Sequence, residues 1–185
     1  MARKLLNEEL NRISVEEFKS STKTPIIIVL DNVRSLLNIG SVFRTADAFS
    51  VEAIYLCGIT GTPPNKEINK TALGSTDSIT WKYFKTTLEA IKELKENSYK
   101  IYSIEQAEKS IHLNDFIPEQ NSKIVLVFGH EVDGVAQQIV DLSDGVIEIP
   151  QTGTKHSLNI AVSVGIVVWD VFLKKMNKDK EQFKR

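Results

Sequence analysis

The polar residues that could do chemistry in this 185-residue chain fall in three short segments. The first spans residues 38–44 and carries Asn38, Gly40 and Arg44 in an NxGxxxR pattern. We expect Gly40 to lie near the start of a helix, where free backbone amides favour an anion such as phosphate. Arg44 lies one turn further along, and its planar guanidinium suits a phosphate. An ordinary capped helix with a surface arginine accounts for the same residues, so both interpretations stay open.

The second segment follows a short apolar run at residues 124–128 and contains Gly129 and Glu131. A glycine at the carboxyl end of a buried strand lets a ligand approach the backbone closely. The carboxylate of Glu131 could bind an amine, a ribose hydroxyl or an arginine. It could also be an acid at a helix start that interacts with the helix dipole.

The third segment is the polar loop QTGTKHS, residues 151–157, with Leu158 and Asn159 directly after it. Ser157 alone could be no more than the N-cap of a helix. We place Asn159 inside an otherwise apolar helix, where its amide needs a hydrogen-bond partner if it is buried. That requirement favours a polar site at this point of the chain.

Alternating strands and helices must position these segments. The apolar runs that we interpret as strands span residues 26–30, 53–57, 81–84, 100–104, 124–128 and 145–150. Helical periodicity covers residues 39–49, 87–95 and 160–173, and a further helix separates the last two strands. This alternation predicts an α/β fold, a mostly parallel sheet with helices on both faces. Ligands of such sheets bind at the carboxyl ends of the strands.

The ends of the chain have a different composition from its middle. Residues 3–20 have amphipathic spacing, which predicts an N-terminal helical extension over residues 1–24. A single domain over residues 25–173 follows, and residues 174–185 form a basic tail. The tail is either a solvated helix end or an RNA contact. Within the domain, residues 58–70 form a long polar loop, and such loops are usually functional or mobile.

Composition removes several classes of function. The net charge of −1 argues against a generally basic nucleic-acid coat, although a local basic patch is compatible with it. Cys57 is the only cysteine, and the three histidines lack metal-ligand spacing, so we expect no metal. GxGxxG, GxxxxGK[ST] and GxSxG motifs are absent from the sequence. Without a signal core or a spanning apolar run, we expect a cytoplasmic protein with no membrane partner.

Taken in order, the three segments resemble the motifs of the SpoU family of RNA ribose methyltransferases, within the SPOUT class, over roughly residues 25–173. The resemblance implies transfer of a methyl group from S-adenosylmethionine to a ribose 2′-hydroxyl of tRNA or rRNA. It also implies a deep C-terminal trefoil knot and a homodimer whose site is completed across the interface. In size the chain is most similar to the compact tRNA methyltransferases that modify a guanosine.

The resemblance also implies roles for single residues. It makes Arg44 the catalytic arginine, acting either as a general base or as a charged group that stabilises the developing alkoxide. The further site residues that it implies are Asn38, Glu131, Ser157 and Asn159. The residues that it implies for cofactor binding are Gly129, Ile149 and Leu158.

Two other readings of the sequence stay open. One is a non-catalytic RNA-binding module that keeps the SPOUT fold. The other is an unrelated doubly wound enzyme for a small phosphorylated substrate. For the homodimer, the final helix has more apolar surface than one face needs. We expect some of Ile160, Val164, Val167, Val168, Val171 and Phe172 to be buried between subunits.

Overall fold

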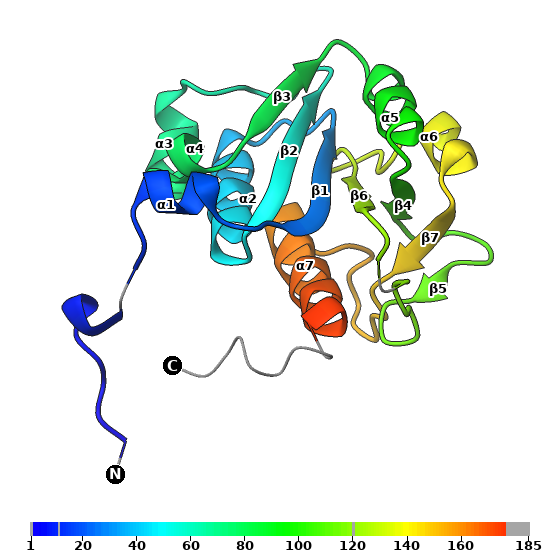
Figure 1. The fold of residues 1–185 in the computed structure, drawn as a ribbon. Coiled ribbons are helices and arrows are strands. Elements are labelled where there is room, and N and C mark those ends of the chain that lie inside the picture. The colour runs from blue at the N-terminus through cyan, green and yellow to red at the C-terminus, as the bar shows by residue number, and fades with distance from the viewer. Residues whose placement is uncertain (1, 11, 120, 177–185) are drawn as a thin grey trace.

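A computed structural model describes residues 2–10, 12–119 and 121–176, which form one parallel sheet between two layers of helices (Figure 1). The strands are β1 (Thr24–Asp31), β2 (Val51–Cys57), β3 (Trp81–Phe84), β4 (Lys100–Ile104), β5 (Ile111–His112), β6 (Ile124–Phe128) and β7 (Gly145–Glu148). Their order across the sheet is β3-β2-β1-β6-β4-β7-β5, and every pairing is parallel. The predicted α/β class is confirmed.

The helices complete the element order. They are η1 (Asn7–Leu10), α1 (Val15–Ser20), α2 (Leu36–Ala48), α3 (Lys66–Ala72), α4 (Ser75–Ser78), α5 (Thr87–Glu96), α6 (Gln137–Leu142) and α7 (Ile160–Met176). Among the described residues, no helix is long and apolar enough to cross a membrane. Residues 177–185 of the predicted basic tail lie outside the described residues, and the trefoil knot stays a prediction.

Alternation of side chains along the central strands builds a core on each face of the sheet. In β1, Ile26, Ile28 and Leu30 join the cluster that packs under α2, α3 and α7. Ile27 and Val29 point the other way, into the cluster formed with α5 and α6. Because both faces are covered, these strands read as continuous apolar runs, which is why the sequence predicted them.

Neighbouring strands β1 and β6 send their chains to opposite faces of the sheet. After β1 the chain enters α2 on one face, and after β6 it enters α6 on the other (Figure 1). In a parallel sheet, this change of direction opens a crevice at the carboxyl ends of the strands. The residues after β1 and β6 therefore lie at the natural place for a ligand.

Two local predictions are wrong, and two short elements were not predicted. Residues 3–20 do not form one helix, because η1 ends at Leu10 and α1 starts only after the N-cap Ser14. Ser14 and Glu17 form a capping box, and the apolar Leu5 and Leu6 are exposed. Residues 58–70 are not all loop, because Asn65 caps α3. The short elements α4 and β5 were too brief to leave a periodic pattern.

Gly40 does not lie at a helix start. The helix begins four residues earlier, where the Ser35 side chain accepts the Asn38 amide as N-cap. Gly40 lies where α2 crosses α3, and a Cβ there would be 2.1 Å from the Ile68 carbonyl oxygen and 2.2 Å from Thr71 Oγ1. The glycine is therefore required for close helix packing, and its amide provides no anion site.

The final helix also differs from expectation. Ile160, Val164, Val167, Val168 and Val171 are buried in the core of the single chain, so the expected burial between subunits is wrong for these five. Phe172 is partly exposed, and its burial between subunits stays a prediction. The exposed apolar side chains of α7 are a different set, Val162, Ile166 and Trp169, with exposed fractions of 50%, 37% and 46%. Phe172 packs against Phe49, with ring centroids 5.4 Å apart.

We predict that Gly40→Ala lowers the free energy of unfolding by about 2 kcal/mol, because the added methyl group meets the Ile68 carbonyl, which is part of another helix. Gly165→Ala is the matched control, since a Cβ at this helical glycine has nothing within 4 Å. The control should gain up to about 1 kcal/mol from helix propensity. Urea unfolding followed by circular dichroism measures both, and equal effects of the two substitutions would contradict the packing role of Gly40.

Candidate active site

The loops that follow β4, β6 and β7 enclose a cavity of about 1120 Å³ at the carboxyl edge of the sheet. Its lining includes residues 104–108, 128–135 and 156–160, together with Ile149 and Gln151. Six of the eight site residues expected from the sequence line it: Gly129, Glu131, Ile149, Ser157, Leu158 and Asn159. The structure thus brings together the second and third segments, which are separated along the chain by α6 and β7.

The loop after β6 folds back on itself immediately beyond the strand. His130 and Gly134 exchange two backbone hydrogen bonds of 3.0 Å each. A Cβ at Gly129 would lie 2.0 Å from the carbonyl carbon of Gly134 and 2.1 Å from the Val135 nitrogen. The close approach that requires glycine at this position is therefore made by the chain's own backbone. A ligand contact at Gly129 stays a prediction.

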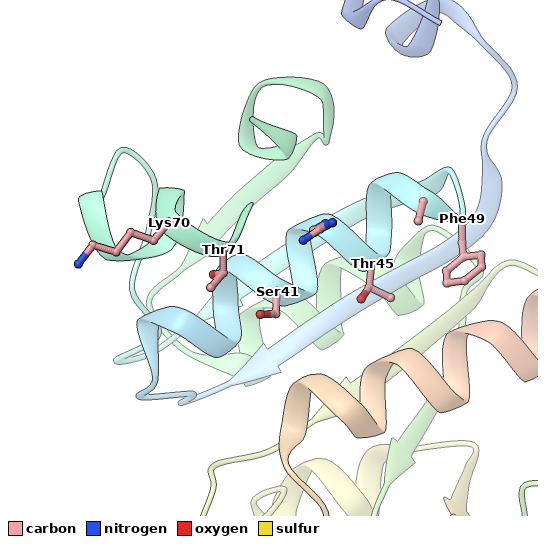
Figure 2. A pocket seen from close by; sticks show the side chains of 7 residues that line it. Ser41, Thr45, Phe49, Lys70 and Thr71 are labelled. Atoms are coloured by element: carbon pink, nitrogen blue, oxygen red, sulfur yellow. The ribbon is translucent and has the colours of Figure 1, made fainter. Parts of the chain in front are cut away.

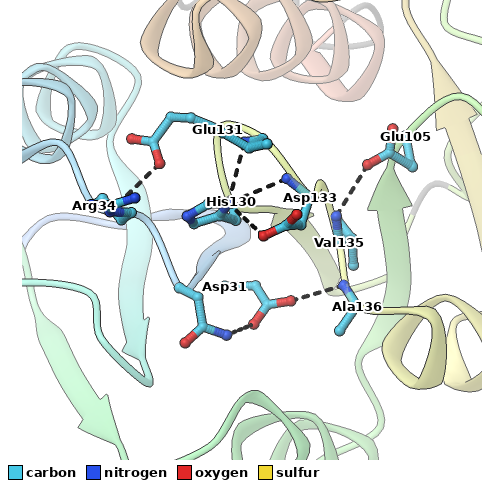
Figure 3. A network of polar contacts seen from close by, with 10 residues as sticks. Asp31, Arg34, Glu105, His130, Glu131, Asp133, Val135 and Ala136 are labelled. Atoms are coloured by element: carbon cyan, nitrogen blue, oxygen red, sulfur yellow. Dashed lines mark hydrogen bonds and ion pairs between the residues drawn. The ribbon is translucent and has the colours of Figure 1, made fainter.

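Two carboxylates at strand ends accept hydrogen bonds from the last residues of this loop, Val135 and Ala136 (Figure 3). The buried Asp31, the last residue of β1, accepts a hydrogen bond of 3.1 Å from the Ala136 amide. Glu105, directly after β4, accepts one of 3.1 Å from the Val135 amide. Sequence analysis missed both residues, although an acid directly after a predicted strand was a visible signal.

Glu131 connects the same loop to the start of α2. Its two carboxylate oxygens accept the backbone amides of Arg34 and Ser35 at 3.1 and 3.0 Å. Burial alone would raise the pKa of Glu131, but these two hydrogen bonds, with a contribution from the Asn38 side chain, hold it below its usual value. Glu131 is therefore not an acid at the start of its own helix, since α6 begins only at Gln137.

Asn159 makes the second connection to α2. It lies immediately before α7, where its Oδ1 accepts the Ala161 amide at 2.9 Å, so it is not inside the helix as predicted. Its Nδ2 donates to Asn38 Oδ1 at 3.2 Å, which supplies the partner that the sequence could not identify. Ser157 is exposed and lies too early in the chain to cap α7.

Arg44 lies apart from this cavity. It belongs to a second hollow of about 480 Å³ formed by the exposed sides of α2 and α3. Figure 2 shows Ser41 and Thr45 along α2 and Phe49 at its C-cap, with Lys70 and Thr71 of α3 also lining the hollow. In a single chain, Arg44 is therefore exposed and does not line the cavity at which Glu131 and Asn159 gather.

The charged side chains of the large cavity have one sign. Its acidic lining residues are Glu105, Glu108, Glu131, Asp133 and Asp141, and the described lining contains no lysine or arginine. Apolar side chains, including Phe128, Ile149 and Leu158, cover other parts of the wall. This lining suits an organic ligand with positive charge and disfavours a phosphate. In the described part of the chain, no cluster of three or more His, Cys, Asp or Glu residues is placed to hold a metal ion.

Comparison with known proteins identifies relatives of the whole domain. Residues 25–169 match the model of the SpoU rRNA Methylase family. The 23S rRNA (guanosine-2′-O-)-methyltransferase RlmB of Vibrio parahaemolyticus is 26% identical over 92% of this chain and 68% of its own length. The tRNA (guanosine(18)-2′-O)-methyltransferase of Thermus thermophilus is 28% identical over 88% of this chain and 81% of its own.

Solved structures share the fold. The A. aeolicus TrmH/SpoU tRNA modifying enzyme superposes with a TM-score of 0.78 at 24% identity, covering 90% of this chain and 82% of that one. The AdoMet-bound rRNA methyltransferase from Sinorhizobium meliloti gives a TM-score of 0.74 at 25% identity, covering 85% of this chain and 57% of that one.

We predict that Glu131→Gln destabilises the protein at pH 7 by about 1 kcal/mol, because the amide oxygen replaces only one of two acceptors and solvent screens the pair at this exposed position. The lowered pKa of Glu131 means that its carboxylate stabilises the fold above the ordinary value of 4.5. That contribution is lost as the pH falls through the lowered folded value. The difference between wild type and variant should therefore shrink below about pH 4.

Unfolding by urea between pH 3 and pH 8 measures this dependence. Glu108→Gln is the matched control, since Glu108 lines the same cavity and has no hydrogen bond or ion pair among the described residues. A Glu131→Gln variant whose stability differs from wild type by the same amount at every pH would contradict the assignment.

Proposed function

Because the chain belongs to the SpoU rRNA Methylase family, we propose that it is an RNA methyltransferase that transfers the methyl group of S-adenosylmethionine to a ribose 2′-hydroxyl of tRNA or rRNA. The observation that carries the proposal is the meeting of Asn38, Glu131 and Asn159 beside an acidic cavity. The names of the tRNA and 23S rRNA relatives both specify guanosine, which supports guanosine as the target nucleoside.

The large cavity fits S-adenosylmethionine in charge and in size. The cofactor carries a sulfonium and an ammonium against one carboxylate, and the described lining offers acidic side chains with no lysine or arginine. Gly129, Ile149 and Leu158 would hold it, with apolar surface for an adenine ring and backbone groups for its polar edges. When bound, the cofactor supplies an electrophilic methyl group on sulfur. The same lining argues against the phosphorylated-substrate reading of the sequence.

The chain's own residues have separate tasks in this reaction. Glu131 and the Asn38–Asn159 hydrogen bond fix the start of α2 beside the cavity. Arg44 lies six residues beyond Asn38 along α2 and outside that cavity. We therefore assign it to a ribose held at the cavity of a second subunit. This arrangement makes a homodimer part of the proposal.

Of the two roles considered for Arg44, general chemistry favours the charged one. An arginine guanidinium stays protonated in proteins, which makes a general base unfavourable. We therefore assign Arg44 the charged role: it stabilises negative charge developing on the ribose oxygen, and water or an RNA phosphate accepts the proton. The single buried cysteine fits a reducing compartment, which supports a cytoplasmic enzyme.

Calorimetry with S-adenosylmethionine, followed by methyl incorporation into tRNA and rRNA transcripts, tests the proposed function. Cofactor binding and a 2′-O-methylated guanosine are expected. Failure to bind S-adenosylmethionine would favour the non-catalytic RNA-binding module, and binding without transfer to either RNA class would refute the substrate assignment.

We predict that Arg44→Ala leaves cofactor affinity unchanged but slows methyl transfer on the order of 10²-fold or more. Arg44→Lys should also fail if the planar fork orients the ribose or its phosphate through paired hydrogen bonds. If Arg44 only attracts RNA, lysine should restore activity and added salt should mimic the defect. Single-turnover methylation at saturating RNA and cofactor separates these outcomes.

Lys70→Ala is the control for Arg44, because Lys70 lines the same hollow and is paired with Glu67 at 2.6 Å. It should retain most of the single-turnover rate. Near-normal transfer by Arg44→Ala would remove Arg44 from the catalytic residues.

We predict that Val162→Asp converts the dimer to a monomer, because it places a charge in the exposed apolar face of α7 formed by Val162, Ile166 and Trp169. Ile117→Asp is the matched control, since Ile117 is 84% exposed and lies outside α7. Sedimentation at micromolar concentration should give a dimer for wild type and control. A monomeric wild-type protein would contradict the proposed assembly.

A further inference from the structure

Glu105 and Gln106 occupy a special place in the sheet. They follow β4 directly, and β4 lies between β6 and β7 in the strand order. The loops after these two neighbouring strands are the ones that wall the large cavity. The side chains directly after β4 therefore lie between the loop after β6 and the loop after β7, where they can contact both loops.

Each of the two residues contacts one wall. Glu105 Oε2 accepts the Val135 amide at 3.1 Å, in the loop that follows β6. Gln106 Nε2 donates to the His156 carbonyl at 2.6 Å, in the loop that follows β7. Glu105 Oε1 also accepts the backbone amide of Gln106 at 2.9 Å, which fixes the Glu105 carboxylate against the backbone that carries the Gln106 side chain.

Backbone groups of β7 and of the loop after β6 hold Glu105 in place and leave room for its carboxylate. The Glu105 amide donates to the Ile147 carbonyl at 3.1 Å, so the residue continues the β4–β7 ladder and is held in place. Gly134 has a φ of +69°, and a Cβ there would lie 2.1 Å from Glu105 Oε2. The carboxylate thus fills the space that a side chain at position 134 would need.

We propose that Glu105 and Gln106 are positioning residues that set the spacing of the two cavity loops, and thereby the affinity for S-adenosylmethionine; this rests on the proposed function. Neither residue needs to touch the reacting atoms. Removing the hydrogen bond to Val135 or the one to His156 lets one cavity loop move relative to the other, so that loop must lose conformational freedom when the ligand binds. This entropy cost reduces the affinity for the ligand. It leaves the transfer step, which depends on Arg44, unchanged.

Two substitutions separate the contacts. Gln106→Met keeps the length of the side chain but removes the donor to His156. Glu105→Gln keeps the shape of the side chain, but its NH₂ group cannot accept a hydrogen bond. One of the two backbone N–H groups, that of Val135 or that of Gln106, therefore loses its acceptor. The matched controls are Gln151→Met and Glu108→Gln, since both residues line the cavity and have no hydrogen bond among the described residues.

Backbone mobility in the ligand-free protein, measured by NMR relaxation, tests the spacing directly. Gln106→Met should lower the order parameters of residues 151–159, and Glu105→Gln should lower those of residues 129–136, with both controls at wild-type values. Unchanged order parameters in these segments would overturn the inference. This measurement does not require cofactor binding, so it stands apart from the test of the proposed function.

Binding and kinetics supply the second readout. Each substitution should raise the Kd for S-adenosylmethionine by about fivefold relative to its control, the equivalent of one lost hydrogen bond. The KM for the cofactor should rise in parallel while kcat at saturation stays near wild type. A fall in kcat without a change in Kd, or equal effects in the controls, would overturn the inference. If Glu105→Gln does not fold, Gln106→Met, at an exposed position, decides the outcome.

Discussion

Backbone amides that leave the carboxyl edge of a parallel sheet have no next strand to pair with, and the structure depends on how they are satisfied. Three carboxylates do this here. Asp31 and Glu105 accept the amides of Ala136 and Val135, and Glu131 accepts two amides before α2. Because these acceptors are charged, each hydrogen bond is stronger than a neutral one. They fix the loop after β6 between its neighbours on both sides.

Two of these carboxylates, Glu105 and Glu131, also line the cavity and contribute to its negative charge, together with Glu108, Asp133 and Asp141. A loop secured by lysine or by neutral side chains could have similar geometry, but it would not add negative charge to this lining. An acidic wall favours a sulfonium ligand and disfavours free phosphates, including those of RNA. Loop anchoring and ligand discrimination therefore share two residues, Glu105 and Glu131.

Helix α2 carries expected site residues on two separate surfaces of the chain. Its start is held at the cavity through Glu131 and Asn38, while Arg44 points into a separate hollow beside α3. Gly40 lies between them and allows α3 to pack closely enough to form that hollow. A single chain thus presents the acidic cavity and Arg44 on separate surfaces, so the proposed homodimer would bring the two together.

The sequence by itself determined the α/β class, most strands of the sheet, and three polar segments, of which the second and third line the cavity. Strands buried on both faces leave continuous apolar runs, and three polar segments after such runs marked the carboxyl edge. Only the tertiary structure showed that Asn159 bonds to Asn38, that Gly40 serves packing, and that Arg44 lies apart. Each of these depends on which segments meet in space, and periodicity along one chain carries no information about contacts between separate elements.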